Sequence, residues 1–557
     1  MRRVDQGAPG RGDRFGFPNA CALVGLEAIS PIRAVLEHLR IPMIEVNPDD
    51  PPDPGQLGVV LLAGNGVASS TGERLAGWLE AVQDAGGGIC VIDSLIVRVS
   101  ARVRGILGIE SALEPTARND FSRLMGSHFL LSPGEGEEAF AMRRCVPAAG
   151  FSLSRQEKCM LHAGAGLTVW AGGQARRGRA VVGGVDPCLW DSAHFGPAAG
   201  LDDLLWRGLA WAARKPFVML AMPPLVAARL DDVIGETGLW HTRALNERGL
   251  RPNLGLDLDY LFPGVEEELK SLVLSGQVQL SPHSFTSYRF LPHDQTELIY
   301  MDWEKGDYPE DVIRRNFQRV DTSFARLGNL QAKALNHHFC QIGTNAVRYL
   351  QQRGVKYLTF PFLHGETLQT AAHRYWNPGP YGRLGYVLDW LPDRSFFVLC
   401  AFPFLEPDIE DLAGGSYRCT VHTTSDLDFL YGCNLRDSIF RDHAKAAEKL
   451  TRQLRIGLGS GFFGHIFTHE PLLVKMTPDD WNLILDWVLD WLGKSGYPWV
   501  ASTLDEIGDY AVRWKQAYLP APLQLALADA NARDGLSSWV FMDESGGTRI
   551  STCPVSA

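Results

Sequence analysis

The feature that most constrains the fold of this chain is an alternation of short apolar runs with amphipathic stretches. GVVLLAG (58–64) and GGICVID (87–93) are strand-like, and ERLAGWLEAVQDAG (73–86) between them has the apolar spacing of a helix. Such strand–helix–strand units join parallel strands, because the chain must cross back over the sheet. We therefore predict a doubly wound parallel sheet of the flavodoxin type over residues 20–215.

A second alternating series begins at residue 216, and its strand-like segments end in polar residues. Examples are LVAARLDD (225–232), VQLSPHS (278–284) and GFFGHIFTHE (461–470). Strands and helices that alternate in this way, with polar groups at the carboxyl ends of the strands, are typical of a (β/α) barrel whose site lies at that face. We predict a distorted (β/α) barrel over residues 216–510.

Two local patterns complete the predicted organisation. Thr477-Pro478, with Asp480 two positions further on, indicates the start of a helix. Near the end of the chain, SSWVFMDESGGTRIS (537–551) indicates a β-hairpin with a Gly-Gly turn. We assign residues 1–19 to a flexible N-terminus and residues 511–557 to a C-terminal extension that contains the hairpin.

Composition limits the classes of partner. The 557 residues carry a net charge of −11 at pH 7 without a basic face, which argues against nucleic acid. No apolar run approaches the roughly 18 residues of a membrane span, and no apolar segment follows the N-terminal arginines, so we expect a cytoplasmic protein without membrane insertion. The ten cysteines lack a metal-finger spacing and are expected to be reduced. An oligomer is compatible with this composition.

The sharpest chemical signal is the pair Asp231-Asp232 at the end of an apolar strand. Adjacent aspartates are usually exposed in a turn or at a helix start. If both are buried, their carboxylates repel each other, and a bound cation removes that conflict. His283 follows another predicted strand, and imidazole together with carboxylate is a donor set typical of zinc. The pattern predicts a divalent-metal site, with zinc as the favoured metal.

In order and context these motifs resemble those of the polysaccharide deacetylase (NodB-homology) family, which removes N- or O-acetyl groups from sugars. The resemblance covers about residues 216–505. It implies that Asp231 is the general base and that Asp232 and His283 are metal ligands. The family pattern has a second histidine four residues after the first, and Ser287 stands at that position here.

The third metal ligand is therefore sought elsewhere. Asn336-His337-His338 precedes the next predicted helix and strand, and two consecutive histidines point in different directions. We choose His338 as the third ligand, with His337 and Ser287 as alternatives; a purely structural role for the histidine pair stays open.

The last motif of the family is an apolar strand that ends in Leu-x-His, and the resemblance implies that this histidine is the general acid. Phe467-Thr468-His469 occupies the corresponding place, so His469 is the candidate acid. Glu470 either orients the His469 ring or is solvated. His465, on the same strand face, is the alternative acid or a core histidine.

The implied reaction is hydrolysis of a linear amide. A metal-dependent hydrolase would remove an acyl group, N-acetyl above all, from an amino sugar or a sugar-containing metabolite, and its substrate would be a small molecule or an oligosaccharide. The alternative is a non-catalytic carbohydrate-binding or scaffold protein with a degenerate site, which Ser287 supports. A glycosidase ranks last, because its two acids stand about 5 to 9.5 Å apart on separate strands.

Residues 20–215 resemble class I glutamine amidotransferase-like domains, whose nucleophilic cysteine lies in a G-x-C-x-G turn. Here Cys90 falls inside a predicted strand and no such turn follows. We expect a buried, unactivated thiol and a domain that is structural or substrate-binding but not catalytic.

Overall fold

The protein is described here by a computed structural model. The described residues are 20–39, 41, 43–64, 73–164, 166–175, 178–191, 193–196, 200–213, 223–287, 290–291, 295–302, 305–338, 341–359, 363–364, 385–387, 397–399, 443–516, 536–542 and 548–554. The predicted flexible N-terminus and the predicted domain boundary near residue 215 lie outside these ranges.

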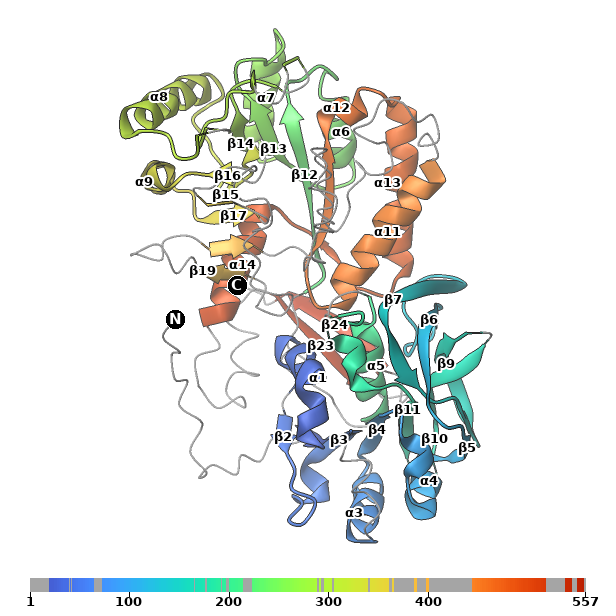
Figure 1. The fold of residues 1–557 in the computed structure, drawn as a ribbon. Helices are drawn as coiled ribbons and strands as arrows, with labels where there is room; N and C mark the ends of the chain where they lie inside the picture. The colour runs from blue at the N-terminus through green and yellow to red at the C-terminus, as the bar shows by residue number, and fades with distance from the viewer. Residues whose placement is uncertain are drawn as a thin grey trace.

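The N-terminal half contains a nine-stranded sheet whose first five strands are parallel, in the order β2-β1-β3-β4-β11. Alternate residues of these strands enter two separate cores, as the two-residue period of a strand requires. Helices α1 and α5 pack in one core and α3 and α4 in the other, so both faces are covered (Figure 1). The elements are β1 (Ala20–Val24), α1 (Leu26–His38), β2 (Met43–Glu45), β3 (Leu57–Ala63), α3 (Glu73–Asp84), β4 (Gly88–Ile92), α4 (Ala101–Leu107), β11 (Arg179–Gly183) and α5 (Asp202–Ala212).

The other four strands of this sheet are antiparallel, so the prediction of a wholly parallel sheet was only partly right. Short connections, such as residues 164–166 between β9 and β10, leave no room for the crossover that parallel strands need. The strands continue the sheet in the order β10-β9-β6-β7, while β5 and β8 pair separately. Their bounds are β5 (Ile109–Ala112), β6 (Thr116–Leu124), β7 (Glu137–Ala148), β8 (Phe151–Leu153), β9 (Gln156–Ala163) and β10 (Leu167–Gln174).

The second half is built on parallel strands in the order β14-β13-β12-β21, with β22 beside the start of β12. The bounds are β12 (Leu225–Val233), β13 (Asn253–Asp257), β14 (Gln279–Ser284), β21 (Gly464–His469) and β22 (Val500–Ala501). A further sheet has the order β15-β17-β20-β19, formed by β15 (Ala334–Leu335), β17 (Tyr357–Thr359), β19 (Gly385–Val387) and β20 (Phe397–Leu399). Strands β16 (Gln341–Ile342) and β18 (Leu363–His364) pair with each other.

The backbone amide of Ala332 donates to the carbonyl of Leu280 (2.8 Å), which brings the segment before β15 against β14. Within the described ranges, no strand pairing closes this row into a ring, so the barrel stays a prediction. The helices around the row are α6 (Trp240–Glu247), α7 (Val265–Leu274), α8 (Glu310–Arg326), α9 (Val347–Gln352), α11 (His443–Gly459), α12 (Glu470–Leu473), α13 (Pro478–Lys494) and α14 (Leu504–Gln516). The fold is therefore mixed α/β with parallel strands in both halves.

The two halves meet through α5 and α11. The indole of Trp206 donates to the carbonyl of Gly459 (2.7 Å), and Arg207 donates to the hydroxyl of Tyr497 (3.2 Å). Gly459 lies just before β21, so this contact is at the amino end of that strand. The carboxyl ends of β12 and β21 point away from the N-terminal sheet (Figure 1).

Two predicted local features are present. Thr477 caps α13 with a reciprocal capping box to Asp480. Strands β23 (Leu536–Met542) and β24 (Thr548–Pro554) are antiparallel partners, and the predicted Gly-Gly turn between them is outside the described ranges. Among the helices that the structure describes, none is long and apolar enough to cross a membrane.

Candidate metal centre

The aspartate pair lies in a bulge of β12. Between Leu230 and Val233 this strand has one residue more than β13 beside it, and Asp232 has a left-handed backbone with φ 53°. A regular strand would point consecutive side chains to opposite faces. Here both carboxylates instead lie near the same imidazole nitrogen. His469 Nε2 is 3.9 Å from Asp231 Oδ2 and 3.9 Å from Asp232 Oδ2. The bulge therefore directs both aspartates into one site.

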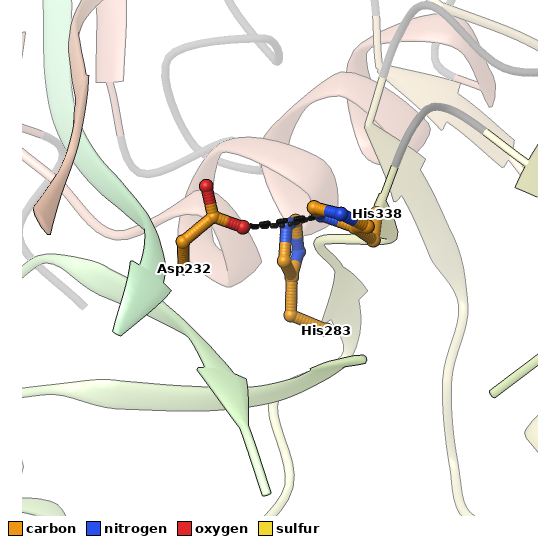
Figure 2. A group of neighbouring side chains, drawn as sticks. All are labelled: Asp232, His283 and His338. Atoms are coloured by element: carbon orange, nitrogen blue, oxygen red, sulfur yellow. Dashed lines mark hydrogen bonds and ion pairs between the residues drawn. The ribbon is translucent and has the colours of Figure 1, made fainter. Parts of the chain in front are cut away.

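Three buried side chains from separate segments converge at this point (Figure 2). Asp232 Oδ1 is 3.3 Å from His283 Nε2 and 3.1 Å from His338 Nδ1, and the two ring nitrogens are 2.7 Å apart. Donors around a tetrahedral zinc, at about 2.0 to 2.1 Å from the ion, are separated by about 3.4 Å. The donor types and the two aspartate distances fit such an ion, and the three residues could hold a metal.

The orientation of the His283 ring is fixed by a hydrogen bond of Nδ1, the ring nitrogen that faces away from the cluster. Its Nδ1 lies 3.0 Å from the backbone carbonyl of Asn336, which can only accept, so Nδ1 carries the proton and Nε2 presents its lone pair to the cluster. Gly255 makes room for this contact. A Cβ atom there would lie 2.9 Å from His283 Nδ1 and 2.7 Å from the side-chain nitrogen of Asn336. The packing thus selects the tautomer that a metal ligand needs.

Opposite charges decide the protonation of the cluster. Burial alone would raise the pKa of Asp232, but His338 and His283 outweigh it and hold that pKa well below its ordinary value. Burial lowers the pKa of His338 to about 4, so this ring is neutral at pH 7. For His283 the nearby carboxylates of Asp231 and Asp232 overcome burial and raise the pKa. Metal ligation needs an ionised carboxylate and neutral imidazoles, so a metal ion would have to displace the proton that the raised pKa of His283 favours.

Asp231 is held by a bidentate partner that sequence reasoning missed. Arg229, two positions earlier in β12, donates from Nε to Oδ1 (2.7 Å) and from Nη2 to Oδ2 (2.5 Å). Asn336 donates its side-chain amide to Oδ1, and Arg229 also donates to the Thr359 hydroxyl (3.2 Å). Burial raises the pKa of Asp231, but the charge of Arg229 outweighs it and lowers that pKa to about 2. Asp231 is ionised throughout the neutral range.

Asp257 is a third buried carboxylate, at the end of β13, and was also missed. It accepts a hydrogen bond from the Ser284 hydroxyl and interacts with Ser287. Burial, together with the charge of Asp232, raises the pKa of Asp257 to about 8. NLGLD (253–257) is an apolar strand with a terminal aspartate, the same signal that identified Asp231, so this residue could have been found.

Ser287 and His337, the alternatives for the third metal ligand, lie outside the cluster of Asp232, His283 and His338. Ser287 is fully buried and belongs with Asp257 rather than to the three-residue cluster. His337 is buried too, but it is outside the cluster, and burial lowers its pKa to about 3. The structure therefore brings His338, of the three candidates, together with Asp232 and His283.

The end of β21 places His469 at the rim of the site. Its side chain is 24% exposed, unlike the buried ligand candidates. The expectation for Glu470 was wrong, because this buried carboxylate accepts hydrogen bonds from the backbone amides of residues 234, 235 and 237 (2.6, 2.8 and 3.1 Å). Glu470 thus fixes the turn that follows Asp232. His465 is a buried core residue that stacks on Phe467.

Cys90 lies in the middle of β4 and is fully buried, as expected for an unactivated thiol. Burial raises its pKa far above the ordinary range. The thiolate that an amidotransferase nucleophile needs is therefore absent at Cys90 near neutral pH. The likeness of this half to amidotransferases stays a prediction.

Together these features define a mixed α/β protein with a buried Asp-His-His cluster at the carboxyl ends of parallel strands, the usual place of a site in such folds. No protein-family model and no curated protein matches the sequence. Among solved structures, the chain is similar to Agd3, described as a novel carbohydrate deacetylase, with 10% identity, a TM-score of 0.53, and coverage of 97% of this chain and 99% of that chain. This likeness extends through both halves and shows a shared fold.

A weaker similarity is to the chitin deacetylase from the fungal pathogen Colletotrichum lindemuthianum. It has 11% identity and a TM-score of 0.28, and it covers 53% of this chain and 91% of that chain. Both of these solved structures are described as deacetylases.

Proposed function

We propose that the protein is a metal-dependent deacetylase that removes an N-acetyl group from an amino sugar within a carbohydrate. The observation that carries the proposal is the convergence of Asp232, His283 and His338, with Asp231 and His469 beside them. The shared fold with Agd3 supports it. The proposed metal is a divalent ion, with zinc favoured by the donor set.

The metal, held by Asp232, His283 and His338, would supply Lewis acidity toward the acyl carbonyl and the attacking water. Asp231 would accept the proton of that water. Arg229 donates to both of its oxygens and Asn336 donates to Oδ1, and Oδ2 also lies 3.9 Å from His469 Nε2. His469 is partly exposed and lies 3.9 Å from both carboxylates, and in its protonated form it would donate a proton to the leaving amine.

The alternative function is a non-catalytic carbohydrate-binding protein with a degenerate site, and the serine at position 287 was the observation that supported it. Ser287 at the expected ligand position suggested a lost donor, but His338 reaches the same cluster from a different segment. Three donors are therefore present although the spacing in the sequence is changed.

The proposal is tested by metal analysis together with acetate release. Wild-type protein and the Asp232→Ala, His283→Ala and His338→Ala variants are loaded with zinc, and bound metal and acetate released from chitotetraose are measured. We expect about one ion per chain in the wild type and loss of both signals in the variants. His337→Ala, a buried neighbour outside the cluster, is the matched control and should keep its metal. A wild-type protein that binds no metal would refute the proposal.

A further inference from the structure

Glu470, the residue after His469, accepts four hydrogen bonds from one turn. Its Oε2 accepts from the backbone amides of Ile234 (2.6 Å) and Gly235 (2.8 Å). Its Oε1 accepts from the amide of Thr237 (3.1 Å) and from the hydroxyl of the same residue (2.7 Å). A buried carboxylate is tolerated when its oxygens are satisfied in this way, and hydrogen bonds to a charged acceptor are stronger than neutral ones. Glu470 is therefore tied firmly to the segment that leaves β12.

The segment that Glu470 holds begins beside a strained residue of the site. Asp232, two positions before Ile234, has a left-handed backbone with φ 53°. Such a conformation is costly for residues other than glycine and persists where the surroundings hold it. Gly235 also has a positive φ, 80°, and a Cβ atom there would lie 2.5 Å from the Val265 side chain. The amides bonded to Glu470 thus belong to a stretch of backbone that has to keep an unusual course.

The hydrogen bonds continue from the turn into the next helix. A carboxylate only accepts, so the hydroxyl proton of Thr237 points to Glu470. The hydroxyl oxygen then accepts from His241 Nδ1 (2.8 Å) and from the amide of Leu239 (3.2 Å). His241 is fully buried in the first turn of α6. One carboxylate therefore fixes the path of the chain from the end of β12 to the start of α6.

Glu470 is also joined by one peptide bond to the proposed proton donor. The pairing of β12 with β21 ends at the partners Asp231 and His469, and Glu470 follows as the first residue of α12. His469 Nε2 lies 3.9 Å from Oδ2 of both Asp231 and Asp232. A displacement of the turn would move the two aspartates relative to this ring. The hydrogen bonds to Glu470 oppose such a displacement.

We propose that Glu470 is a positioning residue of the site. Through the turn it holds Asp232 in the conformation that directs its carboxylate to the two histidines. Through the chain it holds His469 at a fixed distance from both aspartates. The inference rests on the proposed deacetylase function and adds to it a residue that acts through the backbone.

The test compares the full-length wild type with Glu470→Gln and Thr237→Val. Glutamine has the shape of glutamate but a single accepting oxygen, so one pair of donors is left facing an NH2 group. Three quantities are measured: hydrogen exchange of the metal-free protein, zinc affinity, and the visible absorption spectrum of the cobalt(II)-loaded protein. In Glu470→Gln we expect faster exchange at the amides of residues 234, 235 and 237, a changed cobalt spectrum, and about 10- to 100-fold weaker zinc binding. Thr237→Val removes one of the four bonds, so it should change each quantity in the same direction but by less, and it serves as the test if Glu470→Gln does not fold.

Kinetics and a stability control separate positioning from folding. At saturating zinc, kcat for acetate release from chitotetraose should be about 10-fold lower in Glu470→Gln, with KM unchanged. Thr477→Ala removes the cap of α13, so it should lower stability without a change in zinc affinity, cobalt spectrum or kcat. An equal loss of zinc affinity in Thr477→Ala would assign the effect to general destabilisation and overturn the positioning role.

The remaining outcomes distinguish this inference from the deacetylase proposal. A wild type that binds zinc and releases acetate, with Glu470→Gln unchanged in exchange, cobalt spectrum and zinc affinity, overturns the positioning role alone. A wild type that binds no metal overturns the deacetylase function and the positioning role with it. Faster exchange in Glu470→Gln would then show that the carboxylate only stabilises the turn.

Discussion

The side-chain amide of Asn336 donates a hydrogen bond to Oδ1 of Asp231. Through its backbone carbonyl the same residue accepts from Nδ1 of His283 (3.0 Å). One residue thus positions both the proposed base and a proposed metal ligand, the first by its side chain and the second by its main chain. Substitution of the side chain should separate the two effects.

Asn336→Ala should lower kcat about 10-fold while zinc binding is kept. The variant removes a charge-assisted hydrogen bond to Asp231, but the carbonyl that orients His283 remains. Steady-state kinetics and metal analysis measure the two quantities on the same sample. Asn345→Ala, at an exposed asparagine that donates to the backbone carbonyl of Tyr308, is the control. Loss of zinc together with activity would contradict this division of roles.

Arg229→Met should raise the pKa of Asp231, because burial would then act on the carboxylate without a bidentate cation. In the wild type this pKa is about 2, below the ordinary 3.8, so the ionised carboxylate stabilises the fold above about pH 4. That contribution, about 2 kcal/mol, is lost as pH falls toward 2. The variant should lose stability at pH 7 and shift the acid limb of kcat/KM upward.

Urea unfolding and a pH–rate profile from pH 4 to 8 check this prediction. Arg243→Met, which removes an exposed ion pair with Glu268, should change neither quantity. An acid limb at the same pH in the Arg229 variant and the wild type would show that Asp231 is not the group that must be ionised.

Periodic patterns predicted the elements of this fold better than they predicted its sheet order. The strands around Leu61, Cys90 and Ala228 and the cap at Thr477 depend on short stretches of sequence, and the structure has them. The antiparallel half of the first sheet could not be recognised from alternation alone. Both kinds of strand read as apolar runs, and the pairing is decided by contacts between distant segments.

At the site, residues next to a strand end were predictable, and those that depend on three-dimensional proximity were not. The Asp231-Asp232 pair and His283 were identified from their positions at the ends of predicted strands. The choice of His338 over His337 depends on which ring faces Asp232, which local sequence does not determine. Arg229 was overlooked because its position, two residues before Asp231, falls within the predicted strand. That spacing nevertheless places the side chains of Arg229 and Asp231 on one face of the strand.

Metal loading at pH 7 should release a proton from Asp257. Its pKa is about 8 in the metal-free protein, partly because of the negative charge of Asp232, so the carboxyl is mostly protonated. A cation held by Asp232 would lower that pKa and drive ionisation. His338, with a pKa of about 4, has no proton to lose, whereas His283, whose pKa is raised, contributes to the count in the wild type and the variant alike. Calorimetric zinc titrations in buffers of different ionisation enthalpy count the protons, and Asp257→Asn should release fewer than the wild type. Equal counts would exclude Asp257 as the source.

The junction between the halves should be a large source of stability that is independent of the site. Arg455 of α11 pairs with Glu138 of β7 (2.7 Å), and Arg123 pairs with both Glu138 and Asp203. The two arginines and Asp203 are buried, and Glu138 is partly buried. Glu138→Gln leaves the buried guanidinium of Arg455 without the carboxylate that it pairs with, so it should cost about 3 to 5 kcal/mol. Arg315→Ala, which breaks an exposed helical pair with Asp311, should stay within about 0.5 kcal/mol. Denaturant unfolding measures both variants.

This ion-pair network is at the amino ends of the strands of the second half, whereas the metal ligands are at the carboxyl ends. The folded Glu138 variant should therefore bind zinc with unchanged affinity. A weaker affinity would mean that the junction between the halves positions the metal ligands.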